Sequence, residues 1–195
     1  MPDSRASRRV RTIWFVPPVA AAVIAALVGY RLTRPAPPPP DPAIVAAIRP
    51  IPQPYFKLYD QHSEIVRLER YVSRHKLLIA FFDGRGGPGH SPVIREIRQG
   101  LVDLERTGAV VLTISAARPA ENREGQSRSA RFPFPMLSDV TLGEHGKWGV
   151  LDLRTGEPRE AVFIIDRLGV IRQAHFGPDR LGAARDWAAE LRSVR

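Results

Sequence analysis

Residues 76–94 read KLLIAFFDGRGGPGHSPVI, and this order of residue types predicts a strand, a tight loop and a helix in succession. Lys76–Phe82 has the length of a buried strand and is continuously apolar after Lys76. Four glycines and a proline then mark a turn. Ser91 is a residue type that caps helix N-termini, and Pro92 suits the first helical position. The following helix would turn one apolar face inward, made of Val93, Ile94, Ile97, Leu101 and Leu104.

The chain beyond this stretch alternates in the same way. Ala109–Ser115 is a second apolar run. The runs 161–165 and 170–176 flank residues 166–169 (DRLG), which predicts a hairpin with Gly169 in its turn. Near the C-terminus, apolar residues at helical spacing predict a closing helix; they are Leu181, Ala184, Trp187 and Leu191. Strands that alternate with helices favour an α/β sheet covered on both faces, with one terminal hairpin.

An uncharged run of 18 residues, 13–30, precedes these elements. Its length is at the short end of what a membrane-spanning helix needs, ~17–25 residues. Trp14 and Tyr30 stand near its ends, as interfacial aromatic residues do, and arginines flank it on both sides. Positive residues favour the cytoplasmic side, so we expect a basic cytoplasmic N-terminus over 1–12 and a transmembrane anchor over 13–32.

Two other interpretations of this run are open. A cleaved signal peptide would use the small residues 20–22 (AAA) as its cleavage site, but residues 23–28 continue the apolar run past it. A buried core helix would not need the flanking arginines or the proline tract that follows. Pro17 and Pro18 are tolerated in membrane spans, and the uncleaved anchor is therefore the favoured interpretation.

A proline-rich segment separates the anchor from the rest of the chain. Residues 35–54 hold nine prolines, and such a stretch favours extended polyproline II and acts as a semi-rigid spacer. A ligand for SH3-type domains is an alternative, although a tether beside an anchor needs nothing more. We expect a linker over 33–54, a globular domain over 55–195, and a single-pass protein of the inner membrane whose domain lies in the periplasm.

The composition excludes several classes of function. The formal net charge is +9, but residues 1–34 carry six arginines and one aspartate, so membrane topology accounts for more than half of the excess. No basic stripe is interleaved with aromatic residues, and we expect no nucleic-acid partner. The chain has no cysteine, which excludes disulfides, thiolate nucleophiles, thiolate metal sites and iron–sulfur clusters.

Several short motifs, taken in order, resemble the peroxiredoxin family of alkyl hydroperoxide reductases and thiol-specific antioxidant proteins. Residues 56–60 (FKLYD) and 65–68 (IVRL) lead into the strand at 77–82 as in that family. Residues 137–150 resemble its L-S-D … G-V stretch, and residues 163–173 (FIIDRLGVIRQ) are similar to its F-I-I-D-x-x-G-x-x-R hairpin. The resemblance covers residues 55–176. It implies an α/β, thioredoxin-like fold of the peroxiredoxin type, here behind an N-terminal transmembrane helix.

The resemblance also implies where a reaction centre would lie. Peroxiredoxins reduce hydroperoxides with a thiolate at a helix N-terminus, in a Pro-x-x-x-Thr-x-x-Cys loop assisted by a distant arginine. In register with that pattern, Asp83 stands at the proline position and Gly87 at the threonine, while His90 stands at the cysteine and Glu160 at the arginine. Arg159 is adjacent, but on a strand it would point to the opposite face. Two of the four replacements are acidic and would oppose a thiolate or a peroxide anion, so no residue is assigned a catalytic role.

The same loop residues suggest other chemistry. His90 at a helix N-terminus would stay neutral and suit a metal, but metal sites usually take three or four ligands and the other histidines are scattered. A loop histidine that fills a vacated thiol pocket is therefore favoured. Ser91 as a nucleophile would need an adjacent base, whereas its capping role needs none. The loop glycines lack the Gly-Lys-Ser/Thr ending of a P-loop. We expect no cofactor, with His90 as the one weak metal candidate.

Two further thioredoxin-fold groups are similar in arrangement. Membrane-tethered copper-delivery proteins of the cytochrome oxidase assembly type share the anchor and residues 60–61 (DQ), but bind copper through two cysteines and a histidine. Thiol-disulfide reductases need a Cys-x-x-Cys. Our hypothesis is a membrane-anchored, non-catalytic pseudo-peroxiredoxin with a binding or assembly role, whose partners are the lipid bilayer, through residues 13–32, and an unidentified protein. The alternatives are a copper-delivery-type protein, or a redox enzyme that uses a metal or a partner's cysteine.

Overall fold

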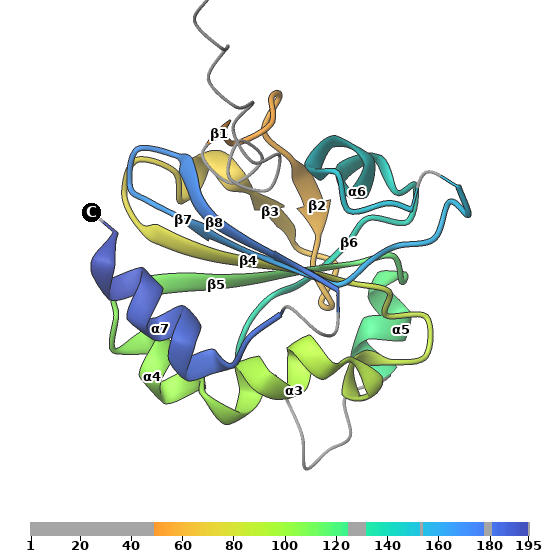
Figure 1. The fold of residues 1–195 in the computed structure, drawn as a ribbon. Helices are drawn as coiled ribbons and strands as arrows, with labels where there is room; N and C mark the ends of the chain where they lie inside the picture. The colour runs from red at the N-terminus through yellow and green to blue at the C-terminus, as the bar shows by residue number, and fades with distance from the viewer. Residues whose placement is uncertain (1–48, 125–131, 153, 178–180, 195) are drawn as a thin grey trace, which may run out of the picture. The chain divides into compact units, whose positions relative to one another are not determined.

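A single mixed sheet forms the centre of the fold (Figure 1). The computed structural model of the chain describes residues 49–124, 132–152, 154–177 and 181–194. Among them, eight strands pair in the order β1-β8-β7-β4-β5-β6-β2-β3. Their bounds are β1 Arg49–Pro50, β2 Lys57–Tyr59, β3 Ile65–Arg67, β4 Lys76–Phe82, β5 Ala109–Ser115, β6 Met136–Ser138, β7 Ala161–Ile165 and β8 Val170–Phe176.

The middle of the sheet confirms the strands predicted from the apolar runs. β4 pairs in parallel with β5, from Lys76 opposite Ala109 to Phe82 opposite Ser115, and it pairs antiparallel with β7. β7 and β8 form the predicted hairpin, whose turn has Gly169 at φ +74°. Because β4 is covered on both faces, its sequence is apolar from Leu77 to Phe82 instead of alternating with polar residues.

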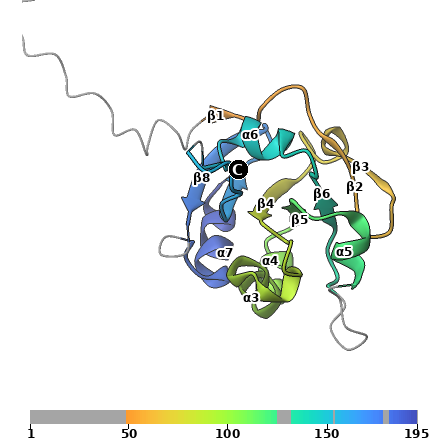
Figure 2. The ribbon, with the colours of Figure 1, turned by 90° about the vertical axis from the view of Figure 1, so that its right-hand side faces the viewer.

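Helices cover both faces of the sheet (Figures 1 and 2). The helices α3, α4 and α7 lie against one face, with Val93, Ile97 and Trp187 packed on Leu78 and Phe82 of β4. The other face carries α6, whose Trp148 packs with Phe81 and Phe163. The helix bounds are η1 Leu68–Arg70, η2 Pro88–His90, α3 Pro92–Gln99, α4 Leu101–Glu105, α5 Pro119–Glu124, α6 Gly143–Trp148 and α7 Ala184–Ser193.

Two helices differ from their predicted extents. The helix expected to carry Val93 to Leu104 is interrupted at Gly100, which ends α3 and precedes α4. The closing helix begins at Ala184, so Leu181 lies ahead of it; Leu181 is buried, and its carbonyl accepts a hydrogen bond of 2.5 Å from Trp187 Nε1. At the first of these differences α7 packs across the α3–α4 break, where Gly100 lies against Ala184.

The break at Gly100 gives a stability prediction. A Cβ on Gly100 would collide with the Cβ of Ala184 on α7. We expect Gly100→Ala to lower the free energy of unfolding by about 1–3 kcal/mol, as overpacked core sites do. Chemical denaturation of the full chain measures the loss, with Gly89→Ala as the control, because a Cβ on Gly89 would meet nothing within 4 Å. An equal effect of the two substitutions would contradict the close approach of α7.

The predicted linker and the sheet overlap at residues 49–54. Arg49–Pro50 forms β1 and pairs antiparallel with β8, and Ile51 is buried with its N–H bonded to the carbonyl of Gly169 at 3.0 Å. The last residues of the proline-rich segment therefore belong to the fold. The predicted cytoplasmic segment 1–12, the anchor 13–32 and the linker up to residue 48 lie outside the described residues. Within the described part, no helix is long and apolar enough to cross a bilayer.

Candidate functional site

The four positions singled out in the sequence meet at one cavity. Asp83 follows β4, Gly87 and His90 belong to the loop and η2, and Glu160 immediately precedes β7, which pairs with β4. The cavity has a volume of about 230 Å³. Its lining residues are Asp83, Gly84, Gly86, Gly87, His90, Ser91, Pro92 and Glu160. The sheet register thus brings together two segments that are more than sixty residues apart in the chain.

The glycine-rich loop is a tight connection between β4 and α3. Gly84 has φ +75°, and a Cβ there would lie 2.7 Å from the Cβ of Ser115 on β5. Gly87, at the predicted threonine position, has φ +89° and donates its N–H to the carbonyl of Gly84 at 2.9 Å. Both residues have positive φ angles, which glycine adopts most readily, so the tight turn of this loop depends on its glycines.

Ser91 caps α3 as predicted, and it also has a second bond that the sequence did not indicate. Its Oγ accepts a hydrogen bond from the N–H of Ile94 at 3.3 Å. The same hydroxyl donates to Oε1 of Glu160 at 2.5 Å. The Glu160 carboxyl also accepts a hydrogen bond from the N–H of Val93. A helix N-terminus attracts negative charge, and in this fold the chain's own carboxyl occupies that place.

Burial is the largest influence on the Glu160 carboxyl. Burial raises the pKa of the Glu160 carboxyl, and this effect outweighs the hydrogen bonds from Ser91 and Val93 and the charge of Arg95, which act in the opposite direction. The cavity floor is thus a Ser–Glu pair on the first turn of α3.

The raised pKa of Glu160 predicts how stability depends on pH. The folded state keeps this proton at pH values where the unfolded chain has lost it, so the contribution to stability is full below the ordinary value of 4.5 and is lost as pH rises through the folded-state pKa. Glu160→Gln removes this dependence. We expect the variant to gain free energy of unfolding relative to the native chain as pH rises through that window, measured by denaturation at a series of pH values. Glu124→Gln, at an exposed site, serves as the control. A difference that does not change with pH would contradict the assignment.

Asp83 belongs to a chain of charges at the rim of the cavity. Its Oδ1 accepts a hydrogen bond from Nε of Arg85 at 2.5 Å, and Arg85 also bonds the carboxylate of Glu157. These hydrogen bonds raise the pKa of Arg85. All three side chains are about half exposed, so the ion pairs contribute little to stability. Their effect is local: two carboxylates neutralise the one arginine of the loop.

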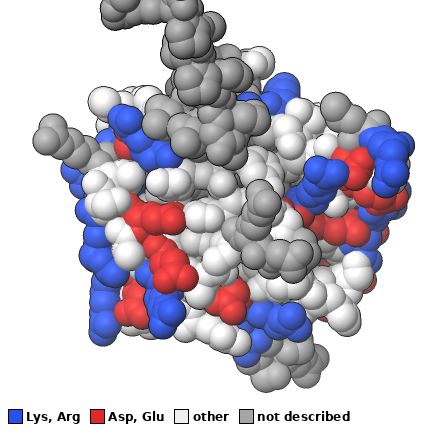
Figure 3. All heavy atoms as spheres, viewed as in Figure 1, with Lys and Arg blue, Asp and Glu red and all other residues white. Residues whose placement is uncertain are grey.

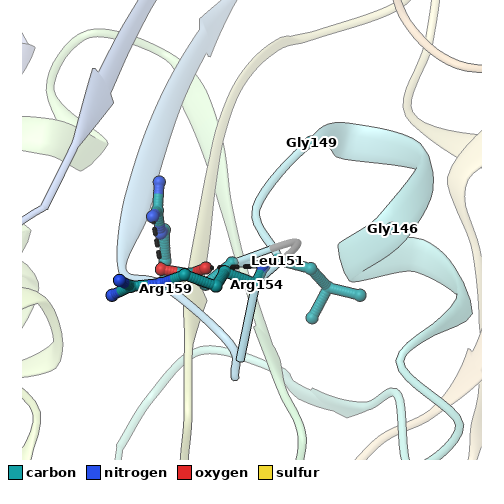
Figure 4. A pocket seen from close by; sticks show the side chains of 6 residues that line it. Gly146, Gly149, Leu151, Arg154 and Arg159 are labelled. Carbon is teal, nitrogen blue, oxygen red and sulfur yellow. Dashed lines mark hydrogen bonds and ion pairs between the residues drawn. The ribbon is translucent and has the colours of Figure 1, made fainter. Parts of the chain in front are cut away.

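Arg159 points away from the cavity, as its place next to Glu160 predicts. Its Nη2 donates to Oδ2 of Asp152 at 2.5 Å, which lowers the pKa of Asp152 (Figure 4). This pair lies in a separate, open cavity of about 690 Å³ beside α6. The described residues that line the cavity at the start of α3 include two carboxylates and no arginine or lysine. Glu160 also lines a neighbouring cavity of about 480 Å³, and Arg159 is among the residues that line that one.

His90 is one of the residues that line the cavity, and it lies exposed on η2. The first turn of α3 next to it carries the Ser91–Glu160 hydrogen bond. As a metal ligand it has no companions in the structure: among the described residues, no three or more His, Asp or Glu side chains are grouped as a metal site requires.

A buried Asp–His pair was missed in the sequence. Asp139 Oδ2 lies 2.8 Å from Nδ1 of His145 and accepts the N–H of the same residue at 2.8 Å. Burial alone would raise the pKa of Asp139, but the bonds from His145 outweigh it and lower the pKa. The pair fastens α6 to the loop after β6, on the face of the sheet away from α3. The only available signal was a spacing of six residues across a turn, which is not diagnostic.

Comparison with known proteins agrees with this architecture. The family model described as "AhpC/TSA family" matches residues 51–174. Proteins named alkyl hydroperoxide reductase E from Mycobacterium bovis and Mycobacterium tuberculosis are 28% identical over 146 residues, which cover 72% of this chain and 94% of theirs.

Solved structures show the same fold. Peroxidoxin BcpB from Mycobacterium tuberculosis superposes with a TM-score of 0.65 at 22% identity, over 76% of this chain and 98% of that one. The mitochondrial 2-Cys peroxiredoxin from Plasmodium falciparum gives 0.60 at 15% identity, over 73% and 90%. The expected thioredoxin-like fold of the peroxiredoxin type is thereby confirmed. Because the family model spans well over half of the sequence, in the same order of elements, this chain belongs to the AhpC/TSA family.

Proposed function

We propose that this chain is a non-catalytic member of the AhpC/TSA family that serves as a membrane-anchored binding or assembly domain. The observation that carries the proposal is the Glu160 carboxyl, bonded to Ser91 and Val93 on the first turn of α3. The family's chemistry requires a thiolate at this helix end, and the chain has no cysteine. The proposal therefore separates the fold, which is retained, from the reaction, which is not.

The charges at the site support the loss of the reaction. A thiolate nucleophile is stabilised by a helix N-terminus and a nearby cation. Here the helix N-terminus is engaged by a carboxyl, and the loop arginine, Arg85, is held by Asp83 and Glu157. The negative charge of Asp83 or of Glu157 would repel a peroxide anion, or a partner's thiolate, brought to the cavity. The same arrangement argues against a thiol supplied in trans.

The proposals of a membrane anchor and of a protein partner rest on the sequence. Residues 13–32 have the length, flanking arginines and end aromatics of a membrane span, and a proline-rich segment joins them to the sheet at β1. A domain that keeps its core but has lost the family's reaction centre can still act by binding through its surface. We propose that this surface binds a protein of the same membrane compartment.

Hydroperoxide consumption by the purified full chain, with a dithiol as the electron donor, tests the proposal. We expect no consumption above that of buffer and dithiol, and the same result for His90→Ala. Consumption that requires His90 would overturn the non-catalytic assignment, because it would reveal a cysteine-free reaction centre. A photo-crosslinker at exposed sites, used in membranes, tests the binding role by whether it captures one defined protein.

A further inference from the structure

The amino ends of β4 and β5, opposite the Glu160 cavity, gather four segments of the chain. Lys76 opens β4 beside Ala109, and Leu77 pairs with Ile165, so the β7–β8 turn lies next to the residues that precede β4. Gly169 of this turn approaches Val72 so closely that a Cβ on the glycine would lie 3.0 Å from Val72 Cγ1. The last turn of α7 joins them, because Lys76 Nζ donates to the carbonyl of Leu191 at 2.8 Å.

Positive side chains dominate this end of the sheet. Arg70, Arg74, Arg167 and Arg192 are exposed, and none takes part in an ion pair among the described residues. Together with Lys76 they form what we call the basic end. Figure 3 shows Lys and Arg along the left-hand edge, with Asp and Glu beside them, on the side where Figure 1 places the β7–β8 turn and the end of α7.

The carboxylates of the same segments do not cancel this charge. Two of them pair with arginines, Asp166 with Arg172 and Asp103 with Arg106. Glu190 bonds His175, which is charged only if protonated, and Glu69 and Glu105 are exposed without such a partner in the described residues. Four exposed arginines and one lysine therefore face three carboxylates that no arginine or lysine pairs, and the excess is positive.

A hydrogen-bonded turn holds an exposed leucine among these basic residues. Leu168 is 77% exposed at the tip of the β7–β8 turn, beside Arg167. Asp166 holds the turn, because its Oδ1 accepts the N–H groups of Leu168 and Val170, both at 2.9 Å. A single exposed leucine is ordinary on a protein surface. An apolar side chain held on a fixed turn among cations is the combination that an anionic bilayer interface binds.

We propose that the basic end, with Leu168 inserted at the interface, docks on an anionic lipid surface. The inference rests on the proposed function in one respect, since residues 13–32 would keep the domain at a bilayer. Charge complementarity argues for the lipid, and so does the entry of the chain through β1, which pairs with β8 directly after the β7–β8 turn. Docking would aim the Glu160 cavity away from the lipid, at the other end of seven-residue β4, about 23 Å along the strand.

A single environment-sensitive label tests the docking, because the chain has no cysteine of its own. Leu168→Cys carries the fluorophore in the full chain, and Ala120→Cys on α5 carries it in a control. We expect the label at 168 to shift to shorter wavelength with vesicles that contain phosphatidylglycerol, and not with phosphatidylcholine alone. The label at 120 should not change. Raising the salt to 1 M, where the Debye length is ~3 Å, should reverse the shift.

Charge variants with matched controls quantify the effect. Each basic residue near an anionic surface contributes about 1 kcal/mol, which is about fivefold in the docked population. Replacement of Arg74, Arg167 and Arg192 by glutamine should therefore reduce docking about a hundredfold. The matched variant replaces Arg118, Arg123 and Arg154, which are exposed near the opposite end of the sheet, and should leave the shift unchanged.

The outcomes separate the docking from the anchoring. If the chain floats with vesicles of either lipid but the label at 168 ignores lipid charge, the docking is overturned and the anchor stands. If the chain floats only with the anionic vesicles, and the label at 168 shifts with them, the anchor fails and the basic end is supported. Equal shifts with neutral and anionic lipid would overturn the proposal. A shift that requires a membrane protein would overturn it too, because the surface would then bind protein.

Discussion

A cysteine placed at position 90 is expected to react slowly with hydroperoxide in the native background, and about tenfold or more faster once Glu160 is also replaced by arginine. His90 is exposed at the end of η2, directly before the Ser91 cap of α3, so His90→Cys puts a thiol within reach of solvent at that helix end. The nearby carboxyls of Asp83 and Glu160 raise the pKa of such a thiol. A guanidinium in place of a carboxyl moves a neighbouring pKa down by about 1–3 pH units, and the thiolate is the reactive form.

The pH dependence of alkylation measures the pKa of the introduced thiol directly, and hydroperoxide consumption measures its reactivity. Ala120→Cys provides the matched control, because its alkylation should be the same with glutamate or arginine at position 160. Equal reactivity of the position-90 thiol in the two backgrounds would show that Glu160 does not suppress chemistry at this site. Such a result would remove the physical basis of the non-catalytic proposal.

Trp187→Ala is expected to cost about 3–5 kcal/mol in the free energy of unfolding, a large part of the total stability of a domain. Trp187 is fully buried on α7 among the side chains of α3 and β4, and its Nε1 donates to the carbonyl of Leu181. The truncation leaves a cavity and also an unpaired carbonyl in the core.

Circular dichroism during urea denaturation measures this loss. Trp187→Phe keeps most of the packing and should lose less, so it remains measurable if the alanine variant fails to fold. Val102→Ala, which is 59% exposed on α4, should change the stability very little. A loss as small for Trp187→Ala as for Val102→Ala would contradict the central place of α7 in the core.

The parts of the fold that the sequence predicts are those specified by local pattern. The buried strands β4, β5 and β7 appear as apolar runs, and the residue types of Ser91 and Pro92 locate the start of α3. The interruption at Gly100 could not be predicted in the same way, because it depends on the approach of Ala184, more than eighty residues further along the chain. β1 was assigned to the linker, since its prolines favour extended chain and only the pairing with β8 makes it a strand.

The candidate site was also predicted in part, by local pattern and not by long-range contacts. Alignment with the family's pattern placed Asp83, Gly87, His90 and Glu160 in register, and the structure brings all four to one cavity. The pattern did not reveal which side chain fills the helix end. A hydrogen bond between Ser91 and Glu160 joins residues 69 positions apart, and neither residue type predicts a contact with the other. Long-range pairing of this kind becomes visible only when the strands have been set in register.

The short strand β1 makes the attachment point of the domain adjustable. Two strand pairs, the N–H of Ile51 and a hydrogen bond of 2.8 Å from Arg49 Nη2 to the carbonyl of Trp148 hold the first described residues to the edge of the sheet, and Ile51 is buried there. An edge segment with few bonds opens more readily than the central strands. Release of residues 49–51 would leave the other seven strands paired. It would add about 10 Å of reach to whatever precedes Arg49. A force applied to the chain from that side would therefore first release residues 49–51 and lengthen the tether, and only a larger force would unfold the domain.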